Sequence, residues 1–126
     1  MTEEENEHNH MITAVFCGWE ARKPIKEYLN GYLELEEEEV GCHVVSNDDI
    51  LEELPYGTDW NYLLPAYNVY REKVKEEVDY DEVTIRKLMI TLDDLTTAIL
   101  YVDIDKAFKE LVTGIELYNT IKIAEV

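Results

Sequence analysis

Carboxylates are the side chains of this sequence with the most evident capacity for chemistry. Neighbouring carboxylates occur throughout the chain, and three aspartate pairs are considered first: Asp48-Asp49, Asp93-Asp94 and Asp103-Ile104-Asp105. Paired carboxylates can hold a divalent cation or divide the work of a general acid and a general base. Each pair stands near the start of an apolar-periodic run, where acidic side chains cap a helix and complement its dipole. We therefore interpret the pairs as helix-start residues, and no calcium-loop spacing or glycine accompanies Asp48 and Asp49.

Cysteine and histidine offer a second kind of chemistry. Cys42 and His43 are adjacent, Cys17 is isolated, and His8 and His10 lie in an acidic N-terminal segment. A zinc site needs clustered ligands at short spacings, and a Cys–His nucleophile needs the two side chains in contact. No serine elbow, GxGxxG, P-loop or HExxH motif occurs. We expect no catalysis, no metal and no cofactor, and we expect both cysteines to be buried thiols in a reducing cytoplasm.

The charge of the chain is the strongest compositional signal. The 126 residues include 29 Asp and Glu against 11 Lys and Arg, which gives a formal net charge of −18. Such a surface repels nucleic acids and anionic membranes, so neither is an expected partner. Two interpretations stay open. The charge serves solubility, or the carboxylates imitate phosphates and occupy a basic groove on another protein.

Acidic residues near the predicted element ends and tyrosines around Pro65 are the candidates for contact with a partner. Aromatic side chains on an acidic surface are typical of protein-binding patches, and packing against a sheet is their equally weighted alternative. The predicted partner-binding residues are Glu34, Glu36, Glu37, Glu38, Glu39, Asp48, Asp49, Glu52, Glu53, Tyr56, Asp59 and Tyr62.

The elements that position these residues follow from the pattern of apolar side chains. Residues 1–10 are polar without an apolar period and predict a mobile acidic tail, which leaves 11–126 as a single domain. A short helix follows, and Gly18 is placed to end it. Alternation in residues 33–36 predicts an edge strand, and residues 40–45 predict another strand. Ser46 or Asn47 then caps a short helix.

The second half of the chain contains the longest apolar periods. One apolar helical face consists of Trp60, Leu63, Leu64, Tyr67, Tyr70 and Val74. It continues through Pro65 and predicts one kinked helix. Residues 81–90 predict a strand, and Thr91 begins a run in which Val102 shares a side with Leu95. Asp103 caps a final helix, in which Gly114 allows the close approach of a neighbour. No apolar run reaches the roughly 18 residues of a membrane span.

We therefore predict a single α+β domain, in which a small and mainly antiparallel sheet is covered by the Pro65 helix and the 103–119 helix. Three short motifs, in their order, resemble the phage ABA sandwich domain of small bacteriophage and prophage proteins. They are VFCGW near the start, TDWNYLLP in the middle and GIELYN near the end. Cys17 stands where the family usually has Met, and Leu117 where it has an aromatic residue. The resemblance implies an α/β sandwich of phage origin, and it brings no reaction and no catalytic residues.

The functional expectation combines the charge with this resemblance. It is a small accessory phage protein that acts in the host cytoplasm, where it inhibits a nucleic-acid-processing or defence protein by imitating nucleic acid. The alternatives are a metal-binding or small-ligand-binding enzyme that uses clustered carboxylates, and a self-assembling structural protein. A second copy of the chain, in a homodimer, is a further candidate partner.

Overall fold

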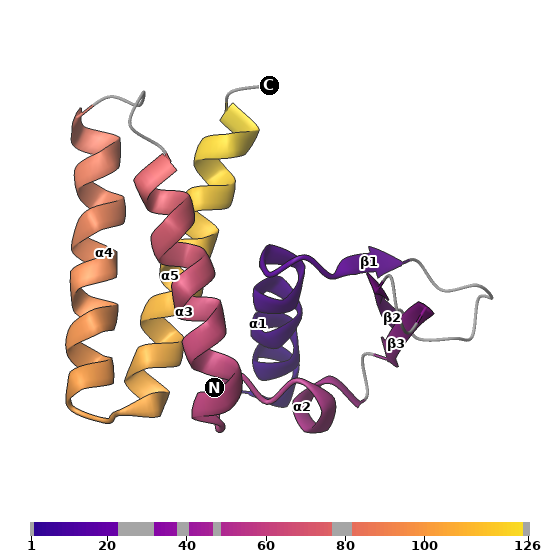
Figure 1. Ribbon diagram of the computed structural model, residues 1–126. Coiled ribbons are helices and arrows are strands. Elements are labelled where there is room, and N and C mark those ends of the chain that lie inside the picture. The colour runs from indigo at the N-terminus through magenta and orange to yellow at the C-terminus, as the bar shows by residue number, and fades with distance from the viewer. Residues whose placement is uncertain (1, 23–31, 38–40, 47–48, 77–81, 125–126) are drawn as a thin grey trace. The chain divides into compact units, whose positions relative to one another are not determined.

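The chain divides into two compact units, Met1–Pro55 and Tyr56–Val126. The computed structural model describes residues 2–22, 32–37, 41–46, 49–76 and 82–124 (Figure 1). The division falls inside the range 11–126 that the sequence analysis assigns to one domain.

In its described residues, the first unit contains two helices and three strands. In chain order they are α1 (Glu3–Phe16), β1 (Glu20–Arg22), β2 (Tyr32–Glu37), β3 (Gly41–Ser46) and α2 (Ile50–Glu53). The strands form an antiparallel sheet in the order β1-β2-β3. Within the unit α1 contacts α2 and β1, and α2 contacts β3.

Helix α1 begins in the segment predicted to be a mobile tail. Thr2 is its N-cap, and the Thr2 hydroxyl accepts a hydrogen bond of 3.1 Å from the Glu5 backbone N–H. A threonine followed three residues later by glutamate is the sequence signature of a capping box, and acidic side chains in a first turn favour the helix dipole. The prediction of a tail followed from the missing apolar period and overlooked this local signal.

Helix α1 ends where the sequence predicts. Gly18 adopts a φ of +114°. Its N–H donates to the Val15 carbonyl, and the Trp19 N–H donates to the Ala14 carbonyl, both over 3.1 Å. These two bonds form a Schellman motif, whose left-handed position suits glycine because glycine has no Cβ.

Strands β2 and β3 lie where the sequence predicts strands, but β2 is the central strand and not an edge. The three-residue β1, too short to show an alternating pattern, pairs with β2 and sets Glu20 opposite Glu34. Ser46 ends β3, so it does not cap the next helix. The N-cap of α2 is Asp49, whose side chain makes no cap hydrogen bond.

The second unit consists, in its described part, of three helices that each contact the other two (Figure 1). They are α3 (Trp60–Glu76), α4 (Glu82–Leu100) and α5 (Ile104–Ala124). Among the side chains that the structure describes in this unit, the buried apolar ones are Tyr56, Leu63, Ala66, Tyr70, Val74, Leu88, Leu95, Ala98, Ala107, Phe108, Leu111, Val112, Ile115 and Tyr118. Their spacing of three and four residues along each helix produces one apolar stripe per helix.

Helix α3 confirms that one helix continues through Pro65, while the kink predicted there stays a prediction. Its buried stripe is shifted from the predicted one. Ala66 takes part in it, whereas Leu64 is exposed. Pro65 is the sixth residue of α3. The first N–H groups of a helix make no intrahelical bond, so the bond that Pro65 removes lies near the start of the helix and not in its middle.

Helix α4 replaces the strand predicted over residues 81–90. Val83 and Ile85 are β-branched and alternate with polar residues, which favours a strand in a short window. In the structure Leu88, Thr91 and Leu95 are buried at helical spacing instead. Thr91 is therefore inside the helix, and its hydroxyl donates to the Lys87 carbonyl over 3.0 Å. Packing along the whole helix overrides the local strand preference.

Helix α5 confirms both predictions made for it. The Asp103 carboxylate accepts a 3.2 Å hydrogen bond from the Lys106 N–H and thereby caps the helix. Gly114 lies against the ring of Tyr70, where an added Cβ would be 2.6 Å from Cζ. The Tyr70 hydroxyl donates to the Leu88 carbonyl of α4 over 3.1 Å. One buried tyrosine of α3 thus contacts both other helices.

The predicted α+β sandwich is therefore wrong. The Pro65 helix and the final helix pack against each other and against α4, and they build a predominantly helical unit. The sandwich implied by the resemblance to the phage family is corrected with it. The physical reason is that residues 82–90, predicted to lie in a strand, belong to a helix of 19 residues.

Candidate functional site

The acidic residues that motivate a binding function are unevenly divided between the units. Residues 1–55 contain 15 Asp and Glu against three Lys and Arg, a formal charge of −12. Residues 56–126 contain 14 Asp and Glu against eight Lys and Arg, a formal charge of −6. The predicted contact residues from Glu34 to Glu53 belong to the first unit, and Tyr56, Asp59 and Tyr62 belong to the second.

The predicted glutamate cluster lies partly on strand β2. Glu34, Glu36 and Glu37 occupy β2, with Val44, Cys42 and Gly41 as their register partners on β3. Glu38, Glu39 and Asp48 lie outside the described residues. The backbone of the sheet therefore carries three of the predicted carboxylates on its middle strand.

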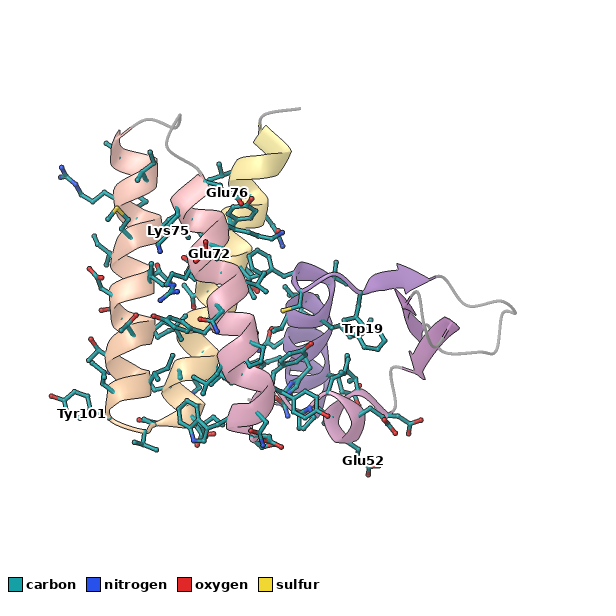
Figure 2. All side chains as sticks on the ribbon, in the orientation of Figure 1. Trp19, Glu52, Glu72, Lys75, Glu76 and Tyr101 are labelled. Atoms are coloured by element: carbon teal, nitrogen blue, oxygen red, sulfur yellow. The ribbon has the colours of Figure 1, made fainter. Side chains whose placement is uncertain are left out.

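Helix α2 carries the second group of predicted carboxylates. Asp49, Glu52 and Glu53 are exposed, and Figure 2 shows Glu52 pointing away from its helix. Ile50 and Leu54 of the same segment are buried. A single turn of helix is thus held by its apolar residues, while its carboxylates face solvent.

The predicted tyrosine patch is corrected by the structure. Tyr56 has only 5% of its surface exposed, whereas Tyr62 has 37%. Their rings meet edge to face, with 6.2 Å between centroids. The Asp59 carboxylate accepts a 2.9 Å hydrogen bond from the Asn61 N–H at the start of α3. Asp59 therefore has a structural role, and Tyr62 is the one member of the three that offers a large exposed side chain.

The histidines and cysteines do not assemble a metal centre in the described part of the chain, where no three His, Cys, Asp or Glu side chains converge. His10, predicted to lie in a mobile tail, is buried in α1. Its Nδ1 lies 2.7 Å from the Asn6 carbonyl oxygen, which can only accept, so Nδ1 donates. Burial lowers the pKa of His10 below its ordinary value of 6.5, and the bond to Asn6 opposes that shift. Cys17 is half-buried, not buried as predicted, and the Cys42 side chain lies outside the described set.

Tyr70 is a second titratable group whose environment is distinctive. Burial raises the pKa of its phenol well above the ordinary value. The phenol therefore keeps its proton and donates it to the Leu88 carbonyl. This hydrogen bond joins α3 to α4 inside the core of the second unit.

One surface feature was missed by the sequence analysis. Leu100, Tyr101 and Val102 follow each other at the end of α4, and 76%, 81% and 70% of their respective surfaces are exposed. Val102 was predicted to share the apolar side of its helix with Leu95. The available signal was an apolar run that continues up to the cap residue Asp103 without a glycine.

No family model, no curated protein and no solved structure matches the chain. The resemblance to the phage family therefore stays a prediction. Among the described helices, none is both long enough and apolar enough to cross a membrane.

Proposed function

We propose that this protein acts by binding, through its carboxylates, to a basic surface of a nucleic-acid-binding protein. The observation that carries the proposal is the formal charge of −12 on residues 1–55. Carboxylates pair with the same Lys and Arg side chains that contact phosphates, and complementary charge accelerates encounter and selects partners.

The resemblance to small phage proteins adds the biological setting to this proposal. In that setting the partner is a host nucleic-acid-processing or defence protein, and the protein is its inhibitor. A chain that occupies a basic groove excludes nucleic acid from that groove, because both need the same cations. Glu34, Glu36 and Glu37 on β2, together with Glu52 and Glu53 on α2, are the described residues that we assign to this contact.

The first experiment identifies the partner and tests competition. The protein is immobilised, host proteins are recovered at low and at high salt, and each recovered protein is then tested for binding to duplex DNA with and without the chain. We expect a basic nucleic-acid-binding protein whose recovery falls as salt rises, and whose DNA the chain displaces. Recovery of no such protein, or binding that is insensitive to salt, would overturn the proposal.

A matched pair of variants then tests whether the location of the charge matters. Glu52→Gln with Glu53→Gln removes two exposed carboxylates from the first unit, and Glu76→Gln with Glu116→Gln removes two from the second. We expect the first pair to weaken binding roughly threefold or more, and the second to change it less than about twofold. Equal effects would mean that net charge alone governs binding. A chain that associates only with itself in sizing experiments would instead support a structural protein.

A further inference from the structure

The turn between α4 and α5 presents three consecutive apolar side chains to solvent. Leu100, Tyr101 and Val102 are the three most exposed large apolar residues among the described side chains. Figure 2 shows Tyr101 extending away from the helices. Figure 1 shows that α4 ends, and α3 and α5 begin, at the same end of the unit. Single exposed apolar residues are common on protein surfaces, so the feature that needs an explanation is three in succession at a projecting turn.

The backbone at this turn is strained at Val102, whose side chain is largely exposed. Val102 has a φ of 56°, in the left-handed region that β-branched residues rarely adopt. Its N–H donates to the Ile99 carbonyl, and the Asp103 N–H donates to the Ala98 carbonyl, both over 3.0 Å. This is the Schellman motif found at the end of α1, where Gly18 occupies the equivalent position. Val102 is largely exposed, so packing within the protein does not compensate for the strain.

The charge around the turn indicates what kind of surface it meets. Asp93 and Asp94 are exposed on α4, and Asp93 lies seven residues before Leu100, which places Asp93 and Leu100 on one side of the helix. Asp103 and Asp105 follow the turn directly. Residues 93–106 contain these four aspartates and a single cation, Lys106. Two copies of the chain that met at this turn would bring like charges together, which disfavours self-association.

We propose that Leu100, Tyr101 and Val102 form a docking tip that inserts into an apolar pocket on a partner protein whose rim carries Lys and Arg. Tyrosine is among the residues that contribute most to binding when desolvated at the centre of an interface. The surrounding aspartates pair with the Lys and Arg of the rim, and they repel surfaces that carry acidic residues at that place. The tip lies in the second unit and uses apolar burial, so it is a different contact from the carboxylates of residues 1–55.

Crosslinking from the tip identifies the partner and tests the surface. The photoreactive residue p-benzoylphenylalanine replaces Tyr101 in one variant and Met89, a 52% exposed residue of α4, in a control variant. Both are irradiated in the native cell, and the linked protein is identified and purified. We expect a partner linked from position 101 and not from 89, with a basic-rimmed apolar pocket at the linked residues. Linkage to a second copy of this chain, or to no protein, overturns the proposal.

Binding of the purified partner then measures the contribution of the tip. We expect Tyr101→Ser to weaken the affinity roughly tenfold or more, while Met89→Ser changes it less than about twofold. We expect Val102→Gly to weaken binding and, at the same time, to raise the thermal midpoint of the free protein by a few degrees, roughly. Equal affinities for Tyr101→Ser and Met89→Ser, or a lower midpoint for Val102→Gly, contradict the proposal. Because these variants leave residues 1–55 unchanged, they fail or succeed independently of the charge variants at Glu52 and Glu53.

Discussion

Two helices in the two units end with the same hydrogen-bond pattern but with different residues at its left-handed position. The end of α1 uses Gly18, which adopts a positive φ without steric cost. The end of α4 uses Val102, for which that conformation is strained. The same backbone motif therefore accommodates either glycine or valine at its left-handed position, and the motif alone does not determine which residue stands there. In the first unit the motif only stops a helix, whereas in the second it also projects a side chain into solvent.

The units also differ in how charge and packing are distributed. The first unit holds two-thirds of the net charge of the chain, −12 of −18. The second unit has eight of the 11 cations and three long helices with a continuous buried stripe each. The first unit is thus suited to long-range electrostatic encounter, and the second to a rigid platform for a short-range apolar contact.

The largest predicted effect compares the cores of the two units. Leu111→Ala in α5 and Ile50→Ala in α2 each remove a fully buried side chain, and each is expected to lower the free energy of unfolding by about 2–5 kcal/mol. We expect the larger loss at Leu111, because long packed helices collapse less around a cavity than a helix of four residues. Denaturant unfolding followed by Trp60 fluorescence for Leu111 and Trp19 fluorescence for Ile50 measures each loss. A larger loss at Ile50 would contradict the expectation that the long helices of the second unit tolerate a cavity less well than α2 does.

The next effect concerns the contact between α5 and α3. Gly114→Ala is expected to lower the free energy of unfolding by about 1–3 kcal/mol, because its Cβ would overlap the ring of Tyr70. In an open position of a helix the same change would be favourable by roughly 1 kcal/mol. Thr113→Ala, at an exposed neighbouring position, is the control and should change stability little. A stabilised Gly114→Ala protein in thermal unfolding would show that the Tyr70 ring moves aside.

A smaller effect, with opposite signs in the two units, tests the two helix ends directly. Gly18→Ala is expected to lower the free energy of unfolding by about 1–2 kcal/mol, because nothing crowds the new Cβ and only the backbone conformation opposes it. Val102→Gly is expected to raise it by about 1 kcal/mol. Circular dichroism during chemical unfolding measures both changes. Changes of the same sign would remove the distinction between a helix stop and a docking tip.

The smallest effect belongs to the first unit and depends on pH. The pKa of His10 is lowered in the folded protein by burial, so the unfolded chain binds a proton more readily. The stability that neutral His10 contributes is therefore complete above pH 6.5 and is lost as pH falls through the folded pKa. We expect the stability difference between wild type and His10→Gln to shrink over that range when Trp19 fluorescence reports unfolding. An unchanged difference would show that His10 binds its proton equally in both states.

Local signals in the sequence predicted several features correctly. Gly18 ends α1, Asp103 caps α5, Pro65 lies within one helix, and Gly114 allows a close helix contact. Each depends on a property of one residue and its immediate neighbours, such as a missing Cβ or a side-chain acceptor near free N–H groups. The capping box of Thr2 and Glu5 was equally local, and it could have predicted α1.

The fold class and much of the candidate site depended on packing between distant residues. Val83 and Ile85 favour a strand in isolation, and only burial of Leu88 and Leu95 against the neighbouring helices makes the segment helical. Packing between distant residues also buries Tyr56 and leaves Tyr62 exposed, although both are tyrosines in one short segment. Exposure is a property of the assembled unit, so residue type could not distinguish them.

The sequence by itself determined the charge of each unit, the helix caps and stops, and the apolar periods of α3 and α5. These follow from composition and from interactions within one or two helical turns. Tertiary structure alone decided that residues 82–100 are a helix, that His10 is buried, and that the apolar turn at Tyr101 faces solvent. The physical reason is that the hydrophobic effect acts on surface removed from water, and that surface is defined only once the helices have packed.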